Sequence, residues 1–291
     1  MTALEPTPAA PVLPDPGADA PPSAARPSRL RHLAAVLVPP LLVLAVVVVA
    51  WYVVSLVVLD EREAFLLPPP HELWTDAFAD PEIRADILDA LWVTTQTALI
   101  GLAISVAIGL VLAVAMARAK WVERSLYPYA VFLQCVPILA IVPLIGFWFG
   151  YEMFARVLVC VIISLFPLII NPLQGLLGAD RGLHDLFTLS HASTWTRLVK
   201  LQLPAALPDI FVGLQIAAGL SVVGATVGDL FFGRGAIGLG LLIQRYSSRL
   251  QSAELLATVL VACLLGLVVF WFFGALGRQV VGRWSTAWGA S

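Results

Sequence analysis

The chain has 291 residues, of which 60% are hydrophobic and 12% are charged, and its mean hydropathy is +0.92. Soluble domains are about one quarter charged, so this composition excludes an ordinary soluble enzyme, a disordered protein and a disulfide-stapled domain. The formal net charge of −2 also argues against nucleic acid as a partner, because such proteins need a surplus of Lys and Arg. The remaining class is an all-α polytopic membrane protein.

The first segment of the chain differs in composition from everything that follows it. Residues 1–30 contain eight prolines and many alanines, with few side chains that build a core. We expect 1–30 to be a disordered Pro/Ala-rich tail. The apolar run 33–59 is longer than the core of a signal peptide and has no small-x-small cleavage site, so it predicts a retained first transmembrane helix.

Six stretches without Asp, Glu, Lys or Arg are long enough to cross a bilayer. A helix of about 20 apolar residues spans a hydrocarbon core of about 30 Å. A transmembrane barrel would show short alternating segments instead of continuous runs. The sequence therefore predicts six transmembrane helices. The six stretches are 33–59, 90–117, 125–151, 157–179, 210–228 and 255–277.

The distribution of Lys and Arg predicts the orientation of these helices. The two tails and the second and fourth connections contain eleven of the 17 basic residues. The positive-inside rule then places both termini in the cytoplasm. The region 60–89 carries nine acidic residues and two arginines, which indicates an acidic extracytoplasmic loop. The six basic residues on the outer side are Arg62, Arg84, Arg156, Arg234, Arg245 and Arg249.

No catalytic or metal-binding pattern is visible. Cys135, Cys160 and Cys263 lie in predicted spans without metal-ligand spacing, and the four histidines are scattered. A phosphate-binding loop is absent, and the glycine-rich stretch 233–240 lacks the lysine that such a loop needs. We expect no catalytic residue, no metal and no cofactor bound by this chain. If transport uses ATP, another subunit must bind it.

The connection between the fourth and fifth spans, residues 180–209, is long and has the pattern of helices. Apolar residues recur there at helical spacing, and Ser193 or Thr194 is suited to cap a second short helix. Pro204 and Pro208 indicate that a new element begins near them. The pattern predicts a helix–turn–helix on the cytoplasmic face. Such an element either lies on the lipid surface or fills a groove on a cytoplasmic partner.

The same segment resembles a known signature. Asp185-Leu186-Phe187-Thr188-Leu189-Ser190-His191, nine further residues and then Leu201-Gln202-Leu203-Pro204 match the spacing of E-A-A-x3-G-x9-I-x-L-P. That signature marks the permease subunits of bacterial type I ABC importers. The resemblance covers about residues 85–280 and is greatest to sulfonate, taurine, nitrate, thiamine-precursor and riboflavin-type permeases. The departures are Asp185 for Glu, Leu186 and Phe187 for the alanines, and His191 for the turn glycine.

The resemblance implies a fold, a function and a set of partners. It implies a permease core at 85–280 with a coupling helix between the fourth and fifth transmembrane helices, in the bacterial cytoplasmic membrane. Import of a small anionic or heteroaromatic solute would proceed by alternating access, driven through the 180–205 segment. The implied partners are an ABC ATPase dimer carrying ATP and Mg, an extracytoplasmic substrate-binding protein, a second copy of the chain and membrane lipid. The implied coupling residues are Leu183, Asp185, Leu186, Phe187, His191, Leu201, Leu203 and Pro204.

Polar residues within the spans are candidates for the translocation path. Such groups are costly when they face lipid, so they either form interhelical hydrogen bonds or line a cavity. Pro137 is expected to bend the third span and to free carbonyl groups toward a cavity. The apolar stretch within 230–253 is too short to cross and predicts a re-entrant hairpin at the outer face. The path candidates are Gln96, Gln134, Asn171, Gln215 and Asp229.

The sequence leaves two roles open for Asp229, and it leaves more than one functional class open for the protein. The carboxylate of Asp229 either forms a gate contact with Arg234 or Arg245 or marks the membrane boundary. The alternative for the chain is a secondary transporter without an ATPase, which predicts ionisable residues at mid-membrane and an inverted repeat. Neither feature is visible in the sequence. A scaffold or membrane-enzyme subunit is a third class, but it would not need the cytoplasmic helix–turn–helix.

Overall fold

A computed structural model describes residues 29–60, 63–233 and 235–282, which form helices and turns and contain no strand. Most of the predicted tail, residues 1–28, lies outside this described part. The α-helices are α1 (Arg29–Val53), α2 (Pro70–Glu72), α3 (Pro81–Arg118), α4 (Lys120–Cys135), α5 (Ile138–Phe149), α6 (Met153–Leu177), α7 (Arg181–Leu189), α8 (Thr194–Arg197), α9 (Leu203–Phe231), α10 (Leu239–Ser248) and α11 (Ser252–Val281). Short 3₁₀ or π turns are found at Val54–Val58, Ala64–Leu66, Leu73–Phe78 and Leu198–Gln202.

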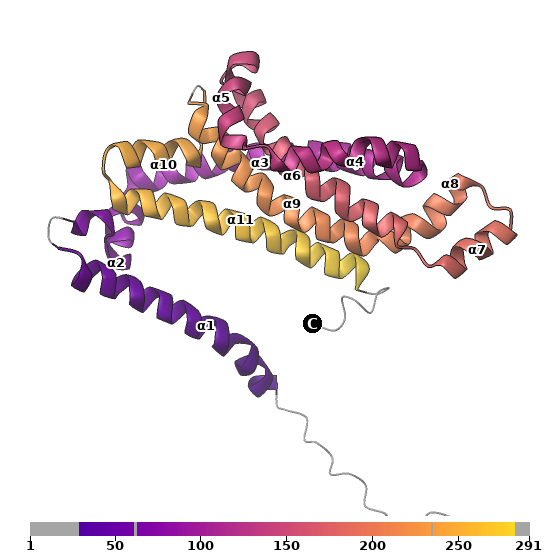
Figure 1. The fold of residues 1–291 in the computed structure, drawn as a ribbon. Coiled ribbons are helices and arrows are strands. Elements are labelled where there is room, and N and C mark those ends of the chain that lie inside the picture. Colours follow the sequence, from indigo (N-terminus) through magenta and orange to yellow (C-terminus); the bar gives the residue numbers. More distant parts are fainter. Residues whose placement is uncertain (1–28, 61–62, 234, 283–291) are drawn as a thin grey trace, which may run out of the picture. The chain divides into compact units, whose positions relative to one another are not determined.

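Five helices in the described residues are long and apolar enough to cross a membrane, and the bent pair α4–α5 makes a sixth if it counts as one span. The prediction of an all-α membrane protein with six spans is therefore confirmed. The chain divides into two units, residues 1–50 and 51–291. The first unit contains most of α1, with Pro39 and Pro40 inside the helix. The second unit contains the remaining helices, and Figure 1 shows them in order.

The core of the second unit is formed by α3, α6 and α9, whose backbones approach closely because small residues lie where they cross (Figure 1). A Cβ atom on Gly101 of α3 would collide with the side chain of Cys160 on α6, and a Cβ atom on Gly224 of α9 would be 2.8 Å from the Cys160 Cα atom. Such close packing by small residues drives helix association in membranes, where lipid removes the hydrophobic effect. The hydroxyl groups of Ser105 and Ser164, 2.8 Å apart and buried, also join α3 to α6.

The third predicted span is broken into two helices. The axes of α4 and α5 differ by 99°, and the break is at Val136 and Pro137. Pro137 provides no amide hydrogen, and the residue before a proline is disfavoured in the helical region, so the helix ends here. The expected bend at Pro137 is therefore confirmed. Pro143 lies inside α5.

The predicted helix–turn–helix is present, and its second short helix, α8, continues into α9. Residues Thr194–Phe231 form one continuous helical segment of 38 residues, in which a π turn at Leu198–Gln202 links α8 to α9. The prediction that a new element begins near Pro204 is confirmed by the start of α9 at Leu203, although the π turn joins α9 to α8 without a break. Pro204 lies in the first turn of α9, and the wider π turn just before it accommodates a residue that has no amide hydrogen to donate.

Candidate functional site

Helix α7 is ended by a turn that its own backbone stabilises. The amide of His191 donates to the Thr188 carbonyl, and the amide of Ala192 donates to the Phe187 carbonyl, both at 3.0 Å. These two bonds define a Schellman motif, in which the residue after the cap is left-handed. This left-handed residue is His191, whose φ is +52°. The family signature has glycine at the same position, and glycine adopts this conformation without strain.

The turn also places α8 relative to α7. The Ser193 hydroxyl accepts a hydrogen bond of 3.1 Å from the Thr196 amide, and this confirms the expected helix cap. The Arg197 guanidinium donates to the Thr188 hydroxyl at 2.9 Å, from the second helix to the first. Both short helices lie together at one end of the second unit, as Figure 1 shows.

The apolar side chains of α7 face outward, since no residue of this helix is buried. Leu183, Leu186 and Leu189 are 46%, 58% and 78% exposed, and Trp195 at the start of α8 is 64% exposed. Asp185 is also exposed, whereas Phe187 is half-buried. Leu189 and Trp195 belong to this surface, although the sequence-based coupling set omits them; the i, i+3 spacing of Leu183, Leu186 and Leu189 is the signal that identifies Leu189.

The other members of the predicted coupling set lie elsewhere. Leu201 is 6% exposed and belongs to the buried residues of the second unit, and Leu203 packs against the core cluster near the ends of α6 and α9. Pro204 is exposed in the first turn of α9. The predicted coupling residues therefore fall into two sets. One set is exposed on α7, and the other, Leu201 and Leu203, packs against the core where α9 begins.

At the other end of α9, two charged side chains are buried. Asp229 is 0% exposed and Arg156 of α6 is 2% exposed, and the Arg156 Nη1 atom is 3.2 Å from the Asp229 Oδ1 atom. The hydroxyl of Thr94 on α3 donates to the Asp229 Oδ2 atom at 2.6 Å. The same hydroxyl accepts from the Leu239 amide at 2.8 Å. We call Thr94, Arg156 and Asp229 the charge cluster.

Arg156 also binds the connector that links α9 to α10. Its Nη1 atom donates to the Ala236 carbonyl at 2.8 Å, and its Nη2 atom donates to the Phe232 carbonyl at 2.6 Å. The predicted gate contact of Asp229 with Arg245 is therefore wrong, and Arg234 lies outside the described residues. The sequence pattern placed Arg156 on the outer side, because it lies in the connection between the charge-free runs 125–151 and 157–179.

The five path candidates are not brought into one site. Gln96 is exposed on α3, and the Asn171 side chain donates to the Pro167 carbonyl of its own helix at 3.0 Å. Gln215 lies against Gly274 of α11. A Cβ atom added to Gly274 would be 2.7 Å from the side-chain amide nitrogen of Gln215. Asp229 belongs to the charge cluster. Gln134 alone of the five lines one of the cavities described below.

A cavity of about 400 Å³ lies beside the break between α4 and α5. The break supplies Gln134, Val136 and Ile138, and α6 and α9 supply the opposite wall. Gln134 is its polar side chain, and the remaining lining residues are apolar. They are Leu133, Val136, Ile138, Leu139, Ile162, Ile163, Phe166, Pro167, Leu220, Val223 and Val227.

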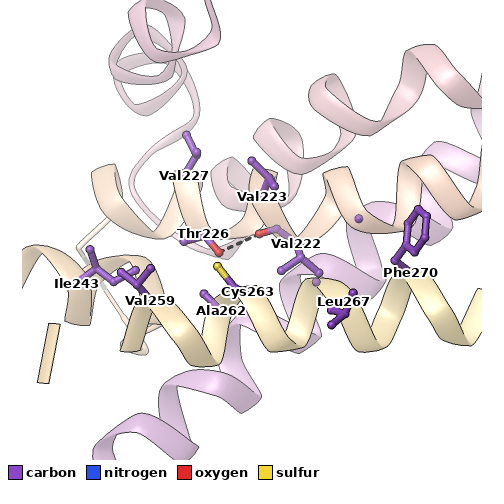
Figure 2. Close-up of a pocket in the computed structure, with 12 residues that line it drawn as sticks. Val222, Val223, Thr226, Val227, Ile243, Val259, Ala262, Cys263, Leu267 and Phe270 are labelled. Carbon is purple, nitrogen blue, oxygen red and sulfur yellow. Dashed lines mark hydrogen bonds between the residues drawn. The ribbon is translucent and has the colours of Figure 1, made fainter. Parts of the chain in front are cut away.

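A second cavity, of about 580 Å³, lies between α9 and α11 and is almost entirely apolar. Figure 2 shows Val222 and Thr226 of α9 facing Ala262 and Cys263 of α11, with Ile243 of α10 at one end. The Thr226 hydroxyl donates to the carbonyl of Val222, so its polarity is satisfied within α9. None of the predicted path residues lines this cavity.

The described residues 29–60, 63–233 and 235–282 contain no group of three or more His, Cys, Asp or Glu side chains placed to hold a metal ion. The ionisable groups that are buried together are the pair Arg156 and Asp229, which bind each other. The chemistry that the arrangement offers is therefore binding and movement: an exposed apolar surface at one end, cavities along α9 and a fixed ion pair at the other end.

Comparison with known proteins identifies the class. Residues 105–282 match the family described as the inner membrane component of binding-protein-dependent transport systems, and the chain belongs to this family. It is 34% identical over 171 residues to the formylaminopyrimidine transport permease ThiX of Halalkalibacterium halodurans, covering 59% of this chain and 68% of that protein. It is 31% identical to the riboflavin transport system permease RibX of Chloroflexus aurantiacus, covering 59% and 63%. The expected likeness to ABC importer permeases of the thiamine-precursor and riboflavin type is confirmed.

A solved structure supports the fold. The MetNI methionine ABC transporter, in an inward-facing conformation, superposes with a TM-score of 0.61 at 16% sequence identity, and the match covers 69% of this chain and 99% of that chain. At this identity the likeness concerns the fold alone. The chain is thus a multi-pass membrane protein with the permease fold of type I ABC importers.

Proposed function

We propose that this permease carries a small solute into the cytoplasm by alternating access, and that a separate ATPase drives it through the 180–205 segment. The observation that carries the proposal is the exposed apolar surface of Leu183, Leu186, Leu189 and Trp195 on α7 and α8. A soluble protein that binds a helix in a groove uses apolar anchors at this spacing. The helices α7 and α8, which carry this surface, lie at one end of the second unit (Figure 1).

The proposed partners follow from the family and from this surface. An ABC ATPase dimer, which carries ATP and Mg, docks on α7, and an extracytoplasmic binding protein delivers the solute. A second copy of the chain completes the pathway, and both termini lie in the cytoplasm. The permease itself catalyses no reaction. To move the bundle from mostly inward-facing to mostly outward-facing, ATP binding must favour one state by about 5 kcal/mol.

The cavity at the α4–α5 break supports a heteroaromatic rather than an anionic solute. Its one polar side chain, Gln134, offers both hydrogen-bond donors and an acceptor, and Phe166 offers an aromatic face. Its lining carries no positive charge that would balance an anion. We therefore propose that Gln134 binds a polar edge of a planar, uncharged ring.

The solute proposal is tested by uptake through the reconstituted importer. Riboflavin and a formylaminopyrimidine serve as ring probes, and taurine serves as the anionic probe. We expect uptake of a ring probe, and we expect Gln134→Leu to raise its KM at least tenfold while the ATPase remains bound. Uptake of taurine alone, or an unchanged KM in Gln134→Leu, would overturn this proposal.

Docking is tested by purifying the tagged permease from its own cells and detecting an ABC ATPase that co-purifies with it. We expect Leu186→Glu and Leu189→Glu to lose the ATPase, because a carboxylate cannot be buried in an apolar groove without a partner. His184→Glu is the matched control, since it adds the same charge on the opposite side of α7 and should retain the ATPase. Retention by all three variants, with normal transport, would show that the ATPase does not dock on this surface. Failure of the wild-type permease to retain any ATPase would leave the secondary transporter as the better assignment.

A further inference from the structure

The helical segment Thr194–Phe231 joins the two ends of the permease. It has 38 residues, which at 1.5 Å per residue is about 57 Å. Its first residues follow the turn after α7, and Asp229 lies two residues before its last residue. A displacement of the α7–α8 end therefore reaches Asp229 through one continuous helix.

The connector between α9 and α10 is bound to that helix through hydrogen bonds from two other helices, α6 and α3. Arg156 of α6 donates to the Phe232 carbonyl at 2.6 Å and to the Ala236 carbonyl at 2.8 Å. The hydroxyl of Thr94 on α3 accepts a hydrogen bond of 2.8 Å from the amide of Leu239, which is the first residue of α10. Arg156 and Thr94 also both contact Asp229. Through these two side chains, the carboxylate of Asp229 on α9 is linked to both ends of the connector.

Packing leaves the connector little freedom to move away from this carboxylate. A Cβ atom on Gly238 would collide with the Asp229 carboxylate, and a Cβ atom on Gly240 would collide with the carbonyl of Thr226. The two glycines let the connector and α10 lie directly against α9. A buried ion pair contributes little net stability compared with apolar residues of the same size, so stability alone does not explain the charge cluster.

We propose that Thr94, Arg156 and Asp229 are positioning residues that make the connector 232–238 and α10 move with α9 during transport. This inference rests on the proposed docking of an ATPase at α7. Movement that ATP causes at α7 then reaches the far end of the permease, where the connector and α10 follow Asp229. Without the cluster, α9 would move while the connector stayed behind.

Hydrogen–deuterium exchange of the purified permease–ATPase complex tests the proposal, with and without ATP and vanadate. In the wild-type complex we expect ATP and vanadate to change exchange both at residues 181–192 and at residues 232–242. In Thr94→Val and Asp229→Asn we expect the change at 181–192 to remain and the change at 232–242 to fall by at least half. Thr94→Val keeps the ion pair and removes only the hydroxyl, so it decides the test if Asp229→Asn fails to fold.

Ser105→Ala is the matched control, because it removes a buried hydroxyl contact between the same helices α3 and α6 far from the connector. It should keep the ATP-dependent change at both sites. An unaltered response at 232–242 in Thr94→Val, or an equal loss in Ser105→Ala, would overturn the inference. Failure of the wild-type chain to retain an ATPase would instead overturn the docking proposal, and the inference with it.

Discussion

The two ends of the helical segment Thr194–Phe231 are stabilised in opposite ways. At the α7 end, the contacts are local: the Ala192 amide bonds to the Phe187 carbonyl, and the Ser193 hydroxyl bonds to the Thr196 amide. At the other end, Asp229 is bound by side chains from α3 and α6. A surface made by local bonds can expose its apolar residues, whereas a buried ion pair requires the whole bundle. Substitutions should therefore cost little stability at the first end and much at the second.

The largest expected effect is at the buried end. Arg156→Met leaves the Asp229 carboxylate buried without its cation, which should lower the free energy of unfolding by about 3–5 kcal/mol. Arg156→Met combined with Asp229→Leu should recover most of this loss, because no unpaired charge remains. Unfolding by SDS titration of the purified protein measures both. Equal stability of Arg156→Met and the wild type would show that the two ends do not differ as described.

A smaller effect is expected where α10 lies against α9. Gly240→Ala places a methyl group against the Thr226 carbonyl, which should force α10 outward and cost about 1–3 kcal/mol. Gly233→Ala is the control, because its new methyl group would be 3.5 Å from the Leu241 side chain, an ordinary contact. The same SDS titration should separate the two variants. If they unfold alike, the close approach of α10 is not a constraint.

At the exposed end, loss of the helix cap should cost about 1 kcal/mol. Ser193→Ala removes the acceptor for the Thr196 amide. We expect faster hydrogen exchange of that amide and its neighbours, with little change in the unfolding of the whole protein. Ser190→Ala, which removes only a hydroxyl donor to the Phe187 carbonyl, should have the weaker effect. A global loss of stability in Ser193→Ala would contradict the local character of this end.

The smallest effect is expected at the turn after α7. His191 has a φ of +52°, so His191→Gly relieves backbone strain but adds freedom to the unfolded chain. The two effects should cancel to within about 0.5 kcal/mol, whereas His191→Val should cost about 1–2 kcal/mol, since a β-branched residue disfavours this region. Exchange of the Ala192 amide reports on the turn. Faster exchange in His191→Gly than in His191→Val would refute this account.

The sequence predicted the features that depend on short stretches. Charge-free runs predicted the spans, Pro137 predicted the bend, and the serine at position 193 predicted a cap, because each depends on neighbouring residues. The signature around Asp185 predicted the family, although its residues differ from the family pattern. His191, which departs from the turn glycine of the signature, is left-handed in the structure, so the turn is kept despite the substitution.

The contacts between distant segments were not predictable in the same way. Arg156 and Asp229 lie on different helices, and nothing in either local sequence indicates that they meet. The continuity of α8 with α9 was missed because the π turn that joins them at Leu198–Gln202 has no sequence pattern that indicates it. Leu189, in contrast, was missed although its spacing of three residues from Leu186 indicates the same surface of α7.

The 99° corner between α4 and α5 has a consequence for hydration. The last carbonyl groups of α4 have no helical donors ahead of them, and Pro137 brings none. Hydrocarbon cannot satisfy these groups, so non-helical backbone at this depth must border protein or an aqueous space. The cavity beside Gln134 adjoins this corner, and water entering it would be able to hydrate the freed carbonyl groups there.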